Sequence, residues 1–212
     1  MIATHRCLIL GLFLCATAQA HQVPNMTIEA EFGSAGSFEM KVNVDPRVFL
    51  SPQPASLPPV VASWYLDQSR EQVKESLKKA TEYLEKNLKL IFGSETFVLP
   101  ECSWQAMDGA TSLPLTAETT EVHLLATLKG AVPASSREFV VGFGAEAQVS
   151  LILLLKNPGQ REPKVQVIFP GENSRPFVTP EPPVKVVKRG FNPRWLLLAA
   201  PLLYAWWRKA RR

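Results

Sequence analysis

The segment MTIEAEFGSAGSFEMKVNV, residues 26–44, decides the expected fold. Apolar and polar residues alternate in residues 26–32 and again in residues 37–44, as they do in β-strands that bury one face. Between these two runs the sequence Gly-Ser-Ala-Gly favours a turn. The segment therefore predicts a β-hairpin, which the Asp-Pro pair at residues 45–46 ends.

The next patterned segment, residues 67–92, has the spacing of a helix. Its apolar residues recur every three or four positions, which places them on one helical face. They are Val73, Leu77, Ala80, Leu84, Leu88 and Ile91. Gly93 occupies the position where glycine commonly ends a helix. We expect one amphipathic helix over residues 67–92, packed against the protein's own sheet.

Five further short segments have the character of strands, and Gly and Pro residues separate them. They are residues 96–99, 119–128, 138–143, 148–155 and 164–169. Residues 151–155 are continuously apolar, which predicts a strand buried on both faces. The expected fold class is mainly β (α+β). It is a β-sandwich over residues 21–171 with one long amphipathic helix inserted after the first hairpin, plus a C-terminal membrane helix.

The composition excludes several classes of protein. The chain has 212 residues, 46% hydrophobic and 20% charged, which fits neither a disordered chain nor a polytopic membrane protein. The net charge of +4 comes from the ends, because eight of the 23 basic residues lie in residues 185–212 and Arg6 lies near the start. Residues 21–184 hold 14 basic and 19 acidic residues. An acidic folded region argues against nucleic acid as a partner.

Residues 1–20 have the pattern of a secretory signal peptide. Arg6 gives a positive start, residues 7–16 form an apolar run, and Ala-Gln-Ala ending at Ala20 matches the cleavage pattern. Cleavage after Ala20 would leave His21 at the new N-terminus. The two cysteines of the leader would leave with it, so the mature chain would contain one cysteine and no intrachain disulfide.

That remaining cysteine, Cys102, is flanked by Glu101, Ser103 and Trp104. This surrounding lacks the positive charge that lowers the pKa of a reactive thiol. We therefore expect Cys102 to act as a small buried apolar residue.

The C-terminus carries a second hydrophobic segment, WLLLAAPLLYAWW, at residues 195–207. Aromatic residues at both ends and basic residues 208–212 after it are typical of a membrane span. A Pro-rich basic stalk, residues 172–194, precedes it. A cleaved leader places the folded domain outside the cytoplasm, so residues 208–212 would form a cytoplasmic tail.

A second interpretation of this end remains open. Pro180, Glu181 and Pro182, an apolar segment and a basic cluster resemble the C-terminal sorting signals of the PEP-CTERM kind. The resemblance implies processing by an exosortase, which would remove the tail and yield a released or transferred surface protein. Residues 183–194 separate the motif from the apolar segment, whereas the two usually adjoin.

The chain contains no nucleophile elbow, phosphate-binding loop, zinc-protease helix or paired-cysteine motif. Catalysis by a Ser-His-Asp triad would need His123 as its base. The alternating sequence around His123 places it on a sheet face instead. Glu29 and Glu31 lie on the same face of a strand. They could form a carboxylate dyad, but a solvated polar surface is the commoner arrangement, and we expect it here. We expect no enzymatic activity.

One metal site is conceivable from the sequence. The free amine of His21, its imidazole and the imidazole of His123 would supply three nitrogen ligands in the T-shaped arrangement of a copper histidine brace. Nitrogen ligands in tetragonal geometry suit Cu(II). This hypothesis requires His21 and His123 to meet in space.

Several features together resemble a known family. Ala20 and His21 stand at the cleavage point, a hairpin follows, and a helix ends in spaced Tyr and Leu residues before a strand. These residues are Tyr83, Leu84, Leu88 and Leu90. The layout of residues 20–170 resembles the exported N-terminal domain of HupE/UreJ-type membrane proteins. The resemblance implies an accessory envelope protein with links to metal (nickel) handling. That family has several membrane helices after this domain, whereas one is expected here, so a transport role is not implied.

The sequence thus predicts a non-enzymatic binding or assembly module in the periplasm or outside the cell. Its C-terminal helix anchors it to the membrane, and we expect a membrane or envelope protein as its partner. One alternative is a copper- or nickel-handling protein that uses His21 and His123. The other is a surface protein with a processed C-terminal sorting signal.

Overall fold

The computed structural model describes residues 24–133 and 136–181. This part of the chain is mainly β, with 40% of residues in strands and 19% in helices, and its strands form two sheets. The expected leader (1–20), membrane segment (195–207) and basic tail (208–212) lie outside the described residues. Among the described residues, no helix is long and apolar enough to cross a membrane.

The larger sheet has six strands in the order β5-β6-β2-β1-β8-β9. Their bounds are β1 Asn25–Phe32, β2 Ser37–Val44, β5 Cys102–Asp108, β6 Val122–Ala131, β8 Ser150–Lys156 and β9 Lys164–Ile168. Neighbours are antiparallel except β1 and β8, which run parallel. The predicted hairpin is confirmed: β1 and β2 pair from Thr27↔Asn43 to Phe32↔Phe38 around the turn.

The smaller sheet has four strands in the order β10-β7-β3-β4. Their bounds are β3 Leu88–Phe92, β4 Glu95–Phe97, β7 Glu138–Phe143 and β10 Phe177–Val178. Phe177 in β10 is almost fully buried. The folded region therefore extends beyond residue 171, and the first part of the expected stalk belongs to the fold.

The two sheets pack against each other through aromatic side chains. The ring of Phe32 in β1 lies 5.2 Å from that of Phe139 and 5.5 Å from that of Phe177, both on the smaller sheet. Phe92 joins the same cluster, with its ring 4.9 Å from Phe139. Such contacts between opposite faces bury the apolar positions of both alternating patterns. The core is therefore one continuous layer between the sheets.

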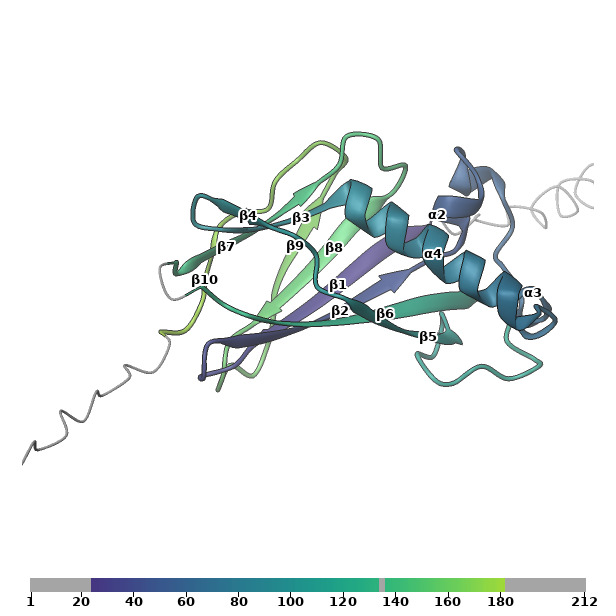
Figure 1. Cartoon of the computed structure of the whole chain (residues 1–212), viewed down its shortest axis with the longest axis horizontal. Coiled ribbons are helices and arrows are strands. Elements are labelled where there is room, and N and C mark those ends of the chain that lie inside the picture. The colour runs from purple at the N-terminus through teal and green to yellow at the C-terminus, as the bar shows by residue number, and fades with distance from the viewer. Residues whose placement is uncertain (1–23, 134–135, 182–212) are drawn as a thin grey trace, which may run out of the picture. The chain divides into compact units, whose positions relative to one another are not determined.

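Helix α4, Arg70–Asn87, covers the part of the larger sheet that the smaller sheet leaves free (Figure 1). Its buried residues Ala80 and Leu84 face the core, and Thr81 accepts a hydrogen bond from the indole of Trp104 in β5 at 3.2 Å. Ser69 caps its first turn by a reciprocal capping box with Gln72.

The prediction of one helix over residues 67–92 was wrong at both ends. The capping box starts the helix at Arg70, and the chain passes at Leu88 directly into β3. Leu88, Leu90 and Phe92 alternate with more exposed residues and pair with β7. The spacing of Leu88 also fits the helix, but its pairing with β7 makes it the first residue of a strand. Gly93 does not end a helix. It turns between β3 and β4 with a φ of 61°.

Two further expectations need correction. In residues 151–155, Ile152 and Leu154 are only half-buried, because the outer face of β8 is not covered. Strands β3, β5 and β10 were not anticipated, and β5 carries a polar residue at nearly every second position. The strands predicted at 96–99, 119–128, 138–143, 148–155 and 164–169 all exist as β4, β6, β7, β8 and β9, with shifted ends in four of the five cases.

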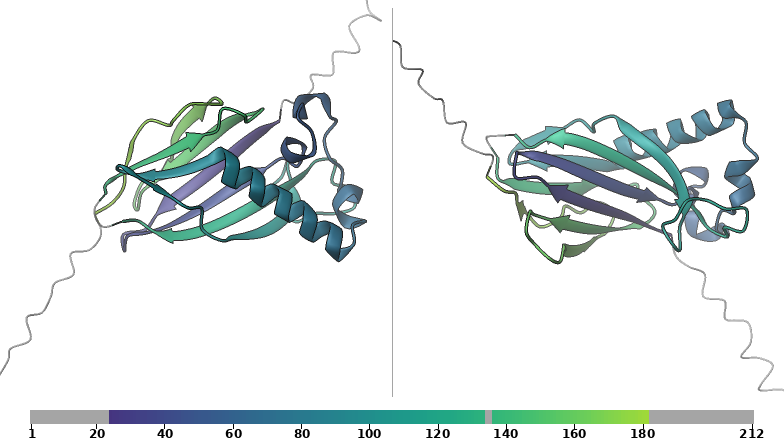
Figure 2. Two further views of the ribbon diagram at one scale, coloured as in Figure 1. Left: turned by 45° about the horizontal axis from the view of Figure 1, so that its top comes forward. Right: turned by 90° about the horizontal axis from the view of Figure 1, so that it is seen from below.

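The outer face of the larger sheet points away from α4 and from the smaller sheet. In the right-hand view of Figure 2 its strands lie in front and α4 lies behind them. Between β2 and α4 the chain forms three short helices, α2 Arg47–Leu50, η1 Pro54–Ser56 and α3 Ala62–Leu66. Backbone hydrogen bonds tie this segment to the start of β6, at 3.0 Å from Ala62 to Thr119 and 2.6 Å from Val122 to Val60.

Candidate functional site

His123 lies near the start of β6, on the outer face of the larger sheet. Its cross-strand neighbour on β5 is Met107. The last paired residue of β2, Val44, is opposite Leu124, so Asp45 emerges beside His123 at the same end of the sheet. The expectation that His123 sits on a sheet face is therefore confirmed, and its side chain is only 12% exposed.

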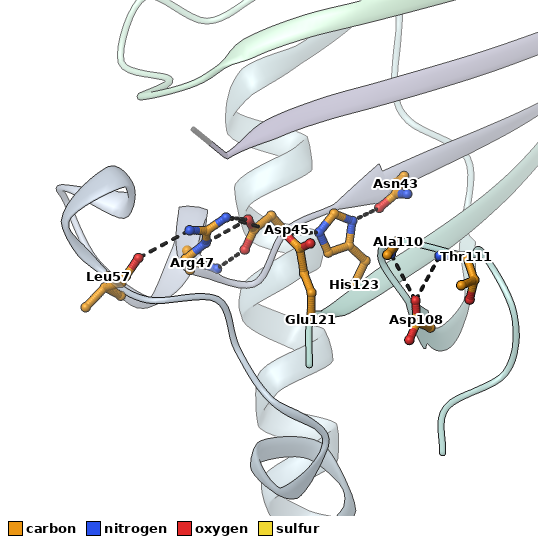
Figure 3. A network of polar contacts seen from close by, with 9 residues as sticks. All are labelled: Asn43, Asp45, Arg47, Leu57, Asp108, Ala110, Thr111, Glu121 and His123. Carbon is orange, nitrogen blue, oxygen red and sulfur yellow. Dashed lines mark hydrogen bonds and ion pairs between the residues drawn. The ribbon is translucent and has the colours of Figure 1, made fainter. Parts of the chain in front are cut away.

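Asp45, Arg47 and Glu121 surround His123 and form a buried polar cluster (Figure 3). The side chains of Asp45 and Arg47 are each 2% exposed. Arg47 donates from Nε and Nη2 to Oδ2 of Asp45 at 2.8 and 2.5 Å, and its backbone N–H donates to Oδ1 at 2.9 Å. Its Nη2 also lies 3.7 Å from Oε1 of Glu121. The guanidinium thus holds the two carboxylates together.

Both ring nitrogens of His123 face polar side chains. Nδ1 lies 2.6 Å from the amide oxygen Oδ1 of Asn43, and Nε2 lies 3.3 Å from Oε1 of Glu121. An amide oxygen only accepts, so with Asn43 in this orientation Nδ1 carries the hydrogen. In a neutral imidazole the lone pair on Nε2 then points toward the carboxylates. In the described part of the chain these partners are Asn43 and Glu121, and neither nitrogen is hydrogen-bonded to a hydroxyl group there.

The loop between β5 and β6 covers the cluster from one side. Gly109 packs so closely on His123 that an added Cβ would lie 2.6 Å from its ring carbon Cδ2. The backbone N–H of Gly109 donates to the carbonyl of Glu121 at 2.7 Å. Asp108 shapes this loop by accepting hydrogen bonds from the backbones of Ala110 and Thr111, and the bond from Thr111 is the main cause that lowers the pKa of its carboxyl.

A shallow groove of about 390 Å³ opens on the outer face beside the cluster. Its lining residues are Thr27, Glu29, Lys41, Asn43, Met107, Ser112 and Leu125. Asn43 belongs both to the groove and to the hydrogen bond with His123, so the groove adjoins the cluster. Ser112, at its rim, has a φ of 59°, a backbone conformation that a non-glycine residue rarely adopts.

Asp45, Glu121 and His123 each offer one ligand atom, and these three atoms lie within 4.8 Å of one another. They are the one such group of three found among residues 24–133 and 136–181. His21, the other residue of the predicted histidine brace, lies outside the described residues. Sequence reasoning identified His123 but missed Asp45 and Glu121, although Glu121-Val-His123 places both side chains on one strand face.

The remaining candidates from the sequence show no site. Glu29 and Glu31 are exposed on the outer face, as expected for a solvated surface. Cys102 is a free thiol, half-buried and packed on the core. Burial raises its pKa, and the negative charges of Glu85 and Glu101 raise it further, so the thiol is not activated.

No protein-family model matches this sequence, and no curated protein matches it either.

Proposed function

We propose that this chain is an exported, membrane-anchored, non-enzymatic binding or assembly module of the cell envelope. The observation that carries this proposal is the outer face of the six-stranded sheet, which no other described helix or strand covers (Figure 2) and which the loop between β5 and β6 covers only at the His123 end. The leader and the apolar C-terminal segment of the sequence support export and anchoring. The β-sandwich fold with its inserted helix serves as the scaffold that presents this face.

The outer face carries an apolar strip on β8 and β9. It consists of half-buried Ile152 and Leu154 with Val165 and Val167, which are 61% and 56% exposed. The register pairs Ile152 with Val167 and Leu154 with Val165, so the four side chains adjoin. Outward apolar residues near a sheet edge expose both side chains and backbone to association, and soluble proteins commonly cover such positions.

Charged pairs lie on the same face. Lys156 of β8 meets Glu31 of the neighbouring β1 at 3.5 Å, and farther from the strip Lys129 of β6 meets Glu39 of β2 at 3.0 Å. An apolar strip beside balanced charges is typical of a protein interface, whereas nucleic acid or an anionic lipid surface would favour an excess of positive charge. These features support an envelope protein as the partner.

A photo-crosslinking amino acid placed at position 167 tests this proposal in intact cells. We expect one discrete cross-linked adduct from position 167. Val98, 91% exposed after β4, provides the matched control position, from which we expect no adduct. Equal adducts from both positions, or none from position 167, would refute docking on the outer face.

The mass of the protein extracted from membranes tests anchoring and processing. A chain from His21 to Arg212 supports a cleaved leader and a retained anchor. A mature chain that ends before residue 195 would instead support a processed sorting signal and a released surface protein. A chain that still contains residues 1–20 would refute export by a cleaved leader.

Copper or nickel handling through His21 and His123 is the second candidate function. The observation that favours it is that β1 starts at the end of the sheet where His123 lies, two strand spacings away, or about 10 Å. Four residues can span up to about 13 Å, so the chain between Asn25 and His21 is long enough for a shared site. The amine and imidazole of His21 would provide two ligands, and His123 the third.

Titration of the full chain in detergent with Cu(II) and Ni(II) tests this candidate. This candidate predicts tight one-to-one binding that one alanine inserted between Ala20 and His21 abolishes, because the ligating amine would be displaced. Equal binding by both forms would rule out a ligand role for the amine.

A further inference from the structure

The buried cluster around His123 combines two carboxylates, one guanidinium and one imidazole. Asp45 and Glu121 contribute the carboxylates, and Arg47 contributes the guanidinium. None of these three side chains is more than 11% exposed, and Asp45 and Arg47 are almost fully shielded from water. Buried carboxylates are stable where they pair with a cation or coordinate a metal ion.

A metal ion would fit at Nε2 of His123. This atom lies 3.3 Å from Oε1 of Glu121, and the three ligand atoms of His123, Glu121 and Asp45 lie within 4.8 Å of one another. Two ligands of a tetrahedral metal at about 2.1 Å are roughly 3.4 Å apart. The pair His123–Glu121 already has this spacing, and the ligand atom of Asp45 lies within 4.8 Å of both.

We infer that Asp45, Glu121 and His123 bind one divalent first-row transition-metal ion at this end of the sheet. Imidazole nitrogen with two carboxylate oxygens suits zinc, copper, nickel or iron, and not the all-oxygen preference of calcium or magnesium. The site goes beyond the proposed docking function and is built from described residues alone, so it does not require His21.

The surroundings of the ligands are those of a metal site. Asn43 accepts from Nδ1 of His123, which holds the ring in the tautomer that presents the Nε2 lone pair. Arg47 holds the Asp45 carboxylate by three hydrogen bonds and so fixes its orientation. Gly109 packs on the ring from one side. The groove that Asn43 lines adjoins the site.

Only a divalent transition metal gains from coordination by the imidazole nitrogen. The alternative occupant of Nε2 is a proton, which would make His123 a hydrogen-bond donor to Glu121 and leave no site for a metal.

The test uses the full chain in detergent, stripped of metal by a chelator and titrated with Cu(II). We expect one Cu(II) per chain and an electron paramagnetic resonance spectrum with coupling to an imidazole nitrogen. Glu121→Gln removes one ligand charge and should weaken binding at least tenfold. Glu29→Gln, an exposed carboxylate on the same sheet face, is the matched control and should change the affinity less than twofold. His123→Gln should remove the nitrogen coupling.

Three results would overturn the inference. The first is a wild-type spectrum without imidazole coupling, which remains decisive even if the Glu121 or His123 variants fail to fold. The second is an equal effect of Glu121→Gln and Glu29→Gln. The third is loss of all binding on insertion of one alanine before His21, because that result would assign the metal to the N-terminal amine. None of these results bears on the cross-linking at position 167, so the two proposals fail separately.

Discussion

Arg47→Met provides the sharpest test of the buried cluster. Arg47 lies in α2 but binds Asp45 through Nε and Nη2, approaches Glu121 at 3.7 Å, and donates from Nη1 to the backbone carbonyl of Leu57 at 3.2 Å. Methionine keeps much of the apolar stem and removes the charge. The substitution therefore isolates what the guanidinium contributes to the fold.

The expected loss follows from burial. Removing one partner of a buried ion pair costs about 3–5 kcal/mol, because the other charge stays buried without compensation. Asp45, 2% exposed, keeps its bond from the backbone N–H of residue 47, so we expect the lower end, about 3 kcal/mol. For a domain of this size that corresponds to a fall in Tm of roughly 6–12 °C.

Thermal unfolding of the full chain, followed by circular dichroism, measures this loss. Arg137→Met is the matched control, because Arg137 pairs with Glu181 where both side chains are about two-thirds exposed. An exposed pair contributes about 0–1 kcal/mol. Adding Asp45→Asn to the Arg47→Met chain should restore part of the stability, since it removes the uncompensated charge. Equal Tm values for the two Met variants would refute the charge argument.

Three further predictions concern other residues. Burial raises the pKa of Tyr83 to about 12. The neutral Tyr83 side chain therefore stabilises the fold fully below pH 10, the ordinary pKa of tyrosine, and this stabilisation of about 2 kcal/mol is lost as the pH rises from 10 to 12. In alkaline denaturation curves, Tyr83→Phe should abolish this loss. Cys102 should react slowly with iodoacetamide near neutral pH, and Glu101→Gln should speed alkylation a few-fold by mass spectrometry; an unchanged rate would contradict the raised pKa. Gly109→Ala should lower stability by about 1–3 kcal/mol in chemical denaturation, because its Cβ would displace the ring of His123; a neutral effect would show that the loop moves freely.

The strands were the part of the fold that periodicity could predict. Residues 26–44 form the hairpin as expected, because alternation over eight residues and a Gly-rich turn act locally. The helix end at Asn87 could not be predicted in the same way, since Leu84 and Leu88 fit both a helix and the start of a strand. Pairing of Leu90 with Val141 on β7 decides between them, and that partner lies about fifty residues away.

The candidate site, too, could be predicted from the sequence only in part. The sequence indicated His123 because few histidines are present and because its neighbours alternate. The sequence did not indicate Asp45 or Arg47, because an Asp-Pro-Arg segment is typical of the end of a strand. Their role depends on the pairing of β2 with β6, which brings residues 45 and 123 together across almost eighty positions.

The sequence by itself determined the hairpin, the amphipathic character of α4 and the position of His123 on a sheet face, because each depends on interactions between residues close in the chain. Only the tertiary structure decided which face of the larger sheet remains uncovered, where α4 ends, and which charges surround His123. Those features depend on strand order and register, which are set by packing between distant segments and leave no local pattern in the chain.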